Sequence, residues 1–453
     1  MRVHFIAIGG SAMHNLAIAL HRKGYNVSGS DDEINEPSRS RLLKQGLLPQ
    51  TIGWDPLRIS TDINAVILGM HARADNPELI RAKELGIKIY SYPEYIYEQT
   101  KDKLRLVVGG SHGKTTITSM ILHVLNFHHI PHDYMVGAQL EGYDCMVGLN
   151  ENTKIAVLEG DEYLSSPEDR RPKFHLYQPH IAILSGIAWD HMNVFPTFEN
   201  YADQFRKFIA LIEPNGKLVY CEMDNELKKL AGENFGNNVM KIPYGIHPFE
   251  IKDETTFLVT PRGKCELRVF GEHNLMNLNA ARIALHELGI DDQKFYTAIS
   301  SFKGASRRLE LVKKNASTAM FRDFAHSPSK LKATTDAVKK QFPGKKLVAC
   351  MELHTFSSLN GEFLQQYNGS MALADVAYVY FNPQTIAHKK LRPVSPEEVK
   401  EAFHSENVEV FTDSGQLMTQ LKSLPNSNTV FLMMSSGTFD GVDIKKLAEE
   451  MVL

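Results

Sequence analysis

The sequence is poor in cysteine. Its 453 residues include four cysteines, Cys145, Cys221, Cys265 and Cys350, and no two of them form a C-x-x-C pair. A small secreted domain held by disulfides needs more cysteines at closer spacing. We therefore expect buried or idle thiols in a protein that works in a reducing compartment.

The sequence also lacks an excess of one charge and a long apolar run. Its 50 Lys and Arg residues face 53 Asp and Glu residues, which leaves a net charge of −3. Bulk electrostatics thus favour neither nucleic acid nor an anionic membrane as a partner. No apolar run is long enough to span a bilayer, and Met1–Gly9 is typical of a short strand rather than a signal peptide. We expect a cytoplasmic protein, and the sequence indicates no oligomeric state.

Internal repeats, low-complexity tracts and heptad patterns are absent as well. The length suggests about three globular domains. Short apolar runs alternate with helical stretches, which is typical of α/β domains with mostly parallel sheets. We predict a Rossmann-like domain over 1–103, a central domain similar to P-loop ATPases over 104–301, and a second Rossmann-like domain over 302–453. The charged segment Glu98–Arg105 is the predicted first linker, and Gly361–Leu373 is a predicted helix.

A glycine-rich turn follows an apolar strand at the start of the central domain. The residues of this phosphate loop are Gly110, Ser111, His112, Gly113, Lys114, Thr115 and Thr116. Backbone amides in such a turn point at phosphate oxygens, the lysine reaches the terminal phosphates of ATP, and the first threonine holds Mg²⁺. The strict pattern G-x-x-x-x-G-K-[ST] is not met, because Val108 replaces its first glycine. The alternative is a glycine turn with an incidental lysine.

Acidic residues follow the strand 154–159. Glu159, Asp161 and Glu162 come at its carboxyl end, where α/β sheets bind ligands. One carboxylate together with Thr115 and phosphate oxygens satisfies Mg²⁺, which keeps several waters. His191 follows the next apolar strand and is a candidate for a second metal or a phosphate. The alternatives are a solvated acidic turn and a structural histidine.

A second candidate phosphate site lies near the N-terminus. Its residues are Gly9, Gly10, Ser11, Ala12 and Met13. They fail the dinucleotide pattern G-x-G-x-x-G, but they place two glycines and a helix start after the first strand, which suits a diphosphate. Asp31 ends the second strand and could meet a ribose or a base. The alternative is a tight turn followed by a loop aspartate. Two phosphate sites on separate domains indicate an enzyme that uses ATP to join a nucleotide-carrying substrate to something else.

Six motifs in matching order resemble the Mur ligases over nearly the whole chain. They are Gly110-Ser-His-Gly-Lys-Thr-Thr116, Glu159-Gly-Asp-Glu162, Asp190-His-Met192, Gly271-Glu-His-Asn-Leu-Met-Asn277, Ser306-Arg-Arg-Leu-Glu310 and Arg322-Asp-Phe-Ala-His-Ser-Pro328. The resemblance implies an ATP- and Mg²⁺-dependent amide ligase. Near the N-terminus, the residues Ile8-Gly-Gly resemble those at the same place in the branch of the family that acts on UDP-N-acetylmuramate.

The resemblance also implies individual roles. Lys114, Thr115 and Glu159 would serve ATP and Mg²⁺, His191 the second metal, Asn274 and Asn277 the adenine, Arg308 the terminal phosphate, Asp323 the ribose, and His326 the substrate. Ser327 stands where the second of two family histidines is common, which leaves that role open. Phe205 falls in the slot of the carbamylated lysine that some members carry, and the branch acting on UDP-N-acetylmuramate also lacks that lysine.

The acceptor is expected to be a peptide. Two kinds of enzyme share this branch, one adding L-alanine and one adding L-Ala-γ-D-Glu-meso-diaminopimelate during peptidoglycan recycling. The loop 163–174 resembles the longer, basic loop of the second kind, and Arg170, Arg171 and Lys173 are candidates to bind the carboxylates of a tripeptide. L-alanine remains the alternative acceptor, and a solvated basic loop the alternative interpretation of the cations. A nucleotide-gated regulatory protein would explain both phosphate sites but not this loop, and a dinucleotide oxidoreductase would leave Lys114 unexplained.

Overall fold

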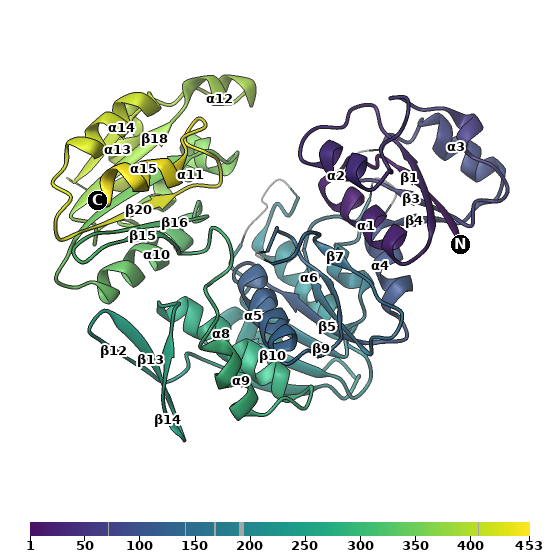
Figure 1. Cartoon of the computed structure of the whole chain (residues 1–453), viewed down its shortest axis with the longest axis horizontal. Helices are drawn as coiled ribbons and strands as arrows, with labels where there is room; N and C mark the ends of the chain where they lie inside the picture. Colours follow the sequence, from purple (N-terminus) through teal and green to yellow (C-terminus); the bar gives the residue numbers. More distant parts are fainter. Residues whose placement is uncertain (71, 141, 167–168, 190–193, 406) are drawn as a thin grey trace. The chain divides into compact units, whose positions relative to one another are not determined.

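The computed structural model describes residues 1–453 except 71, 141, 167–168, 190–193 and 406. The chain divides into two compact units. The first comprises Met1–Ile246 and Met276–Ile299, and the second comprises His247–Leu275 and Ser300–Leu453. The first unit contains two mainly parallel sheets and the second unit contains a third (Figure 1). Among the described residues, no helix has the length and apolar character needed to cross a bilayer.

The N-terminal sheet has the strand order β2-β1-β3-β4, and its paired strands are parallel. Its strands are β1 (Arg2–Ile6), β2 (Asn26–Ser30), β3 (Ala65–Leu68) and β4 (Ile89–Ser91). Its helices are α1 (Ser11–Arg22), α2 (Ser38–Lys44), η1 (Pro56–Arg58), α3 (Pro77–Glu84) and α4 (Tyr92–Thr100). The chain moves to one side of β1 and then to the other, so the strand order reverses at the turn after β1, where open α/β sheets bind ligands.

The central sheet has the order β11-β10-β9-β5-β8-β6-β7. Its strands are β5 (Leu104–Gly109), β6 (Asp133–Met135), β7 (Val147–Gly148), β8 (Ile155–Glu159), β9 (Ile181–Leu184), β10 (Lys217–Cys221) and β11 (Met240–Tyr244). Its helices are α5 (Lys114–Phe127), η2 (Lys173–Leu176), α6 (Phe198–Ala210), α7 (Asn225–Gly232), α8 (Glu272–His286) and α9 (Asp292–Ile299). Because β5 pairs in parallel with both β8 and β9, the segments after these three strands lie at one edge of the sheet.

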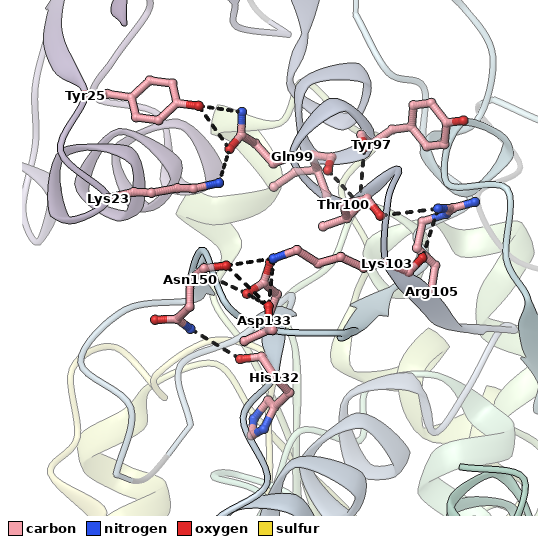
Figure 2. A network of polar contacts seen from close by, with 12 residues as sticks. Lys23, Tyr25, Tyr97, Gln99, Thr100, Lys103, Arg105, His132, Asp133 and Asn150 are labelled. Carbon is pink, nitrogen blue, oxygen red and sulfur yellow. Dashed lines mark hydrogen bonds and ion pairs between the residues drawn. The ribbon is translucent and has the colours of Figure 1, made fainter.

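The joint between the first two sheets is shorter than predicted. Helix α4 continues to Thr100 and β5 starts at Leu104, so most of the predicted linker is regular structure. Arg105 is 1% exposed, and its Nη1 donates to the carbonyl oxygens of Thr100 at 3.2 Å and Lys103 at 3.1 Å (Figure 2). The guanidinium of Arg105 therefore binds the end of α4 instead of facing solvent, whereas Lys101 and Asp102 of the same segment are exposed.

The second unit combines an antiparallel meander with a six-stranded sheet of order β15-β16-β20-β17-β18-β19. The meander strands are β12 (Phe249–Lys252), β13 (Thr255–Thr260) and β14 (Gly263–Leu267). The sheet strands are β15 (Glu310–Lys314), β16 (Ala319–Asp323), β17 (Lys346–Leu353), β18 (Val376–Phe381), β19 (Val408–Phe411) and β20 (Thr429–Met434). All pairs in this sheet are parallel except β15 with β16.

Helices form two hydrophobic cores with this sheet. They are α10 (Pro328–Gln341), η3 (Ser357–Leu359), α11 (Gly361–Leu364), η4 (Gln365–Tyr367), α12 (Pro383–His388), α13 (Pro396–Phe403), α14 (Ser414–Ser423) and α15 (Ile444–Met451). Successive residues of β17 alternate between the cores, with Ala349 and Met351 in one and Val348 and Cys350 in the other, as expected for a strand buried on both faces. The helix predicted over Gly361–Leu373 is shorter, because the α-helix ends at Leu364 and a 3₁₀ turn follows.

Candidate active site

The phosphate loop connects β5 to α5, and two of its glycines are required by their surroundings. Gly110 and Gly113 have φ values of 123° and 80°, in the left-handed region. A Cβ atom on Gly113 would lie 2.4 Å from Oδ1 of Asn277, and one on Gly110 would lie 2.3 Å from Oγ of Ser185. Val108, which replaces the first glycine of the strict pattern, is a buried residue of β5, so the loop proper starts after the strand.

Lys114 is the first residue of α5 and is held by two oxygen atoms. Its Nζ donates to the carbonyl oxygen of Gly110 at 2.7 Å and to Oε2 of Glu162 at 2.8 Å. Burial favours the neutral amine, but Glu162, Asp161 and Glu159 outweigh burial and hold the pKa of Lys114 above its ordinary value. The ammonium is therefore charged at any physiological pH.

Thr115 and Glu159 meet beside this lysine. The Oγ1 of Thr115 donates to Oε1 of Glu159 at 2.8 Å, and the amide of Gly137 donates to Oε2 at 2.9 Å. Burial and the charge of Asp161 raise the pKa of Glu159, against the two donors. A buried hydroxyl and carboxylate in contact are oxygen ligands of the kind that Mg²⁺ takes alongside phosphates and water, so these residues fit the metal.

The predicted second metal ligand, His191, lies outside the described residues. Within the described part of the chain, no group of three or more His, Cys, Asp or Glu side chains is placed to hold a metal ion. Phe205 stands at the position of the carbamylated lysine that some Mur ligases carry. It is fully buried and packs against Tyr201 with ring centroids 5.0 Å apart. An apolar ring at this place supplies no metal ligand.

The N-terminal glycines open onto a cavity of about 430 Å³ at the end of β1. The amide of Gly9 donates to Oδ2 of Asp31 at 2.7 Å, and burial raises the pKa of Asp31 to about 6 although this amide opposes the shift. Of the residues predicted to bind the substrate, Gly9, Gly10, Ser11 and Asp31 line the cavity, whereas Ala12 is not among the lining residues and Met13 is buried in the core. The cavity thus presents amides and hydroxyls near a helix start.

Other lining residues were not found by sequence reasoning. Arg41 of α2 contributes a guanidinium and His14 of α1 an imidazole. Gln139 and Met146 lie in the segment between β6 and β7 of the central sheet. Nη2 of Arg41 donates to Oε1 of Gln139 at 2.7 Å. Arg41 is a cation in the segment that follows the glycine turn and the second strand, and this was the available signal in the sequence. The distance along the chain between Arg41 and the glycines does not show that α2 lies over the turn after β1.

Four predicted residues belong to the second unit. Asp323 ends β16, is buried, and accepts hydrogen bonds from the amides of Leu309 and Ala325, while burial raises its pKa. The guanidinium carbon of Arg308 lies 4.5 Å from the ring centre of Phe324. The other two bond to nearby carbonyl oxygens, Asn274 to Phe270 at 2.9 Å and His326 to Phe324 at 2.8 Å.

The basic loop is largely paired with acids of its own surroundings. Nη2 of Arg171 lies 2.7 Å from Oδ2 of Asp169 and 3.6 Å from Oε1 of Glu94. Nζ of Lys173 lies 3.4 Å from Oδ2 of Asp161. Arg170 is exposed. Of the three predicted cations, Arg170 is therefore the one that faces solvent without an ion pair among the described residues.

Comparisons with known proteins cover the three domains. Family models described as "Mur ligase family, catalytic domain", "Mur ligase middle domain" and "Mur ligase, glutamate ligase domain" match residues 2–103, 108–285 and 307–437. The chain is similar to the UDP-N-acetylmuramate–L-alanine ligase of Carboxydothermus hydrogenoformans, with 31% identity over 75% of this chain and 73% of that protein.

Solved structures agree with this fold. A UDP-N-acetylmuramate–alanine ligase from Thermotoga maritima superimposes with a TM-score of 0.70 at 21% identity, covering 100% of this chain and 98% of that one. The UDP-N-acetylmuramate:L-alanyl-γ-D-glutamyl-meso-diaminopimelate ligase from Neisseria meningitides gives a TM-score of 0.60 at 25% identity, covering 68% of this chain and 99% of that one. The predicted class, three α/β domains, is confirmed. The chain therefore belongs to the Mur ligases, ATP-dependent enzymes that form carbon–nitrogen bonds in peptidoglycan synthesis.

Proposed function

We propose that the protein joins the carboxylate of UDP-N-acetylmuramate to the amine of an amino acid or peptide at the expense of ATP. The observation that carries this proposal is the contact of Thr115 with Glu159 beside Lys114, at the carboxyl ends of β5 and β8. The cavity after β1, with Gly9, Gly10 and Asp31, offers a separate place for the diphosphate of the sugar nucleotide.

The reaction needs positioned charges rather than a covalent nucleophile. The lactyl carboxylate attacks the γ-phosphorus of ATP, ADP leaves, and an acyl phosphate forms. The acceptor amine then attacks the acyl carbon, loses a proton, and inorganic phosphate departs. Lys114 would neutralise the negative charge that develops on the phosphoryl oxygens, and Arg308 would add a second cation. Thr115 and Glu159 would hold Mg²⁺, which supplies Lewis-acid stabilisation of the phosphates.

The comparisons favour L-alanine as the acceptor. Relatives named UDP-N-acetylmuramate–L-alanine ligase reach about 30% identity over most of the chain, for example 30% over 86% of it in the enzyme from Desulforamulus reducens. The tripeptide L-Ala-γ-D-Glu-meso-diaminopimelate, which we predicted from the sequence, is the second candidate. The loop 163–174 with exposed Arg170 supports it, as does the likeness to the Neisseria enzyme.

An acceptor panel tests both levels of the proposal. The full chain would be incubated with UDP-N-acetylmuramate, Mg-ATP and either L-alanine or the tripeptide, with phosphate release and product mass as readouts. One acceptor should raise phosphate release well above background and give a product heavier by that acceptor less water. The Lys114→Ala variant should lose on the order of 10² to 10³ in rate, by analogy with loss of a preorganised charge stabiliser. Background release with every acceptor, or an unchanged Lys114→Ala rate, would contradict the proposal.

A further inference from the structure

The lysine of the phosphate loop has a buried carboxylate partner that the proposed reaction does not use. Glu162 is 1% exposed, and its Oε2 lies 2.8 Å from Nζ of Lys114. Glu159, three positions earlier, already provides the carboxylate that contacts Thr115. The chain thus places a second buried carboxylate against the cation that has to meet the nucleotide phosphates.

Glu162 is held in place from its other side. Its Oε1 accepts a hydrogen bond from the hydroxyl of Tyr201 at 3.5 Å. The ring of Tyr201 is fully buried between Phe195 and Phe205, with centroid distances of 5.4 Å and 5.0 Å. A phenol packed in this way is a fixed donor, and together with the ammonium of Lys114 it favours this position of the Glu162 carboxylate.

The local charge balance then opposes a bare polyphosphate. Glu159, Asp161 and Glu162 supply three carboxylates close to the loop, and Asp161 is 3.4 Å from its cation partner, Lys173. Lys114 is matched by Glu162, which leaves the carboxylate of Glu159 in excess. A nucleotide without a divalent cation would bring about four more negative charges to this place, whereas a magnesium complex would bring the cation that Glu159 and Thr115 fit.

We propose that Glu162 is a counter-ion of Lys114 that competes with the nucleotide phosphates, so that the site selects magnesium-complexed over metal-free nucleotide. This inference rests on the proposed nucleotide site and concerns its selectivity. It assigns to Glu162 a positioning role that acts through Lys114. With glutamine at 162, the ammonium would lose its charged partner and would gain more from a phosphate oxygen.

The test is calorimetric binding of ATP to the full chain, with excess magnesium and with excess EDTA. The Glu162→Gln variant should bind metal-free ATP at least tenfold more tightly than the wild type, while its affinity for Mg-ATP changes less than threefold. Tyr201→Phe should change the ratio of the affinity for metal-free ATP to the affinity for Mg-ATP in the same direction, by a smaller factor. The matched control is Glu199→Gln, which removes the same charge from a side chain that is 80% exposed on the same unit, and it should leave the ratio unchanged.

The outcomes separate this inference from the proposed function. A wild type that binds Mg-ATP, with no gain for metal-free ATP in either variant, would overturn the counter-ion role and leave the ligase proposal standing. Weaker binding of both forms by Glu162→Gln would also overturn it, because it would make Glu162 part of the binding surface. If Glu162→Gln fails to fold in a thermal melt, Tyr201→Phe decides alone. A wild type that binds neither form would overturn both proposals.

Discussion

Single residues of the phosphate loop have conformations and neighbours that limit what can replace them. Gly113 has a left-handed backbone, and the side chain of Asn277 occupies the space that a Cβ atom at this position would need. Lys114 follows directly. These constraints explain why the sequence pattern alone located this loop, since glycine at such positions is a steric requirement. The partners Asn277 and Glu162 could not be derived in the same way, because spacing says nothing about which distant side chain packs behind a turn. The family resemblance assigned Asn277 to the adenine rather than to a contact with Gly113, and nothing in the sequence pointed to the pairing of Glu162 with Lys114.

Replacement of Gly113 by alanine should damage the loop without unfolding the chain. The new Cβ would clash with Asn277 Oδ1 and the residue would keep a φ of 80°, which together cost on the order of 1–3 kcal/mol. We expect a lower melting temperature and weaker Mg-ATP binding. Gly232→Ala is the control, because that glycine ends α7 and a Cβ added there would have no neighbouring atom within 4 Å. Equal nucleotide affinity in the Gly113 and Gly232 variants would refute the packing argument.

Asp31 should make stability depend on pH. Its pKa is raised from 3.8 to about 6 in the folded protein, so the unfolded chain ionises first as pH increases. Between these values folding loses stability, and above about pH 6 the loss is constant. Asp31→Asn should therefore be more stable than the wild type by about 1–3 kcal/mol at about pH 7.5, with the gain disappearing near pH 4. Denaturant unfolding at both pH values measures this. The control is Asp75→Asn, which removes the same charge from an exposed side chain of the same unit and should give no gain in stability at about pH 7.5.

At the scale of elements, buried parallel strands were the part of the fold most accessible to prediction. The runs that became β3 and β9 are apolar throughout, and those that became β5 and β17 are mostly apolar, as expected for strands buried on both faces. Segments whose role depends on tertiary contacts were misjudged. The charges of Glu98–Arg105 indicated a linker, yet Arg105 is a buried residue of β5 whose guanidinium donates to main-chain carbonyl oxygens.

Arg105 should therefore contribute more to stability than an ordinary surface arginine. Besides the end of α4, it binds the carbonyl oxygen of Tyr177 through Nε at 2.8 Å and Glu213 through Nη2 at 2.9 Å. Arg105→Met fills similar volume but leaves these acceptors unsatisfied, so we expect a loss of about 2–4 kcal/mol in the free energy of unfolding. Arg39→Met, at an exposed position of the same unit, should change it by less than about 0.5 kcal/mol. Similar melting curves for the two variants would show that the carbonyl contacts contribute little.

At the scale of the whole molecule, the first unit carries two candidate ligand sites on two sheets. One is the phosphate loop after β5, and the other is the cavity after β1 that Arg41 lines. They are built from different strands, and a dehydrogenase or a simple nucleotide hydrolase would need only one of them. The proposed placement of ATP at the phosphate loop and of the sugar nucleotide in the cavity predicts that each site can be disabled without the other.

Two variants should show this separation in ligand-induced thermal stabilisation. A ligand at about 100 times its Kd stabilises the folded state by about 2.7 kcal/mol, enough for a measurable rise in Tm. Lys114→Ala should lose the rise caused by Mg-ATP and keep the rise caused by UDP-N-acetylmuramate. Arg41→Ala should do the opposite, because a guanidinium beside a glycine turn is suited to hold a diphosphate. Loss of both responses in either variant, with the unliganded Tm unchanged, would mean that the two ligands share one site, and the assignment of a sugar-nucleotide site to the sheet of β1 would then be wrong.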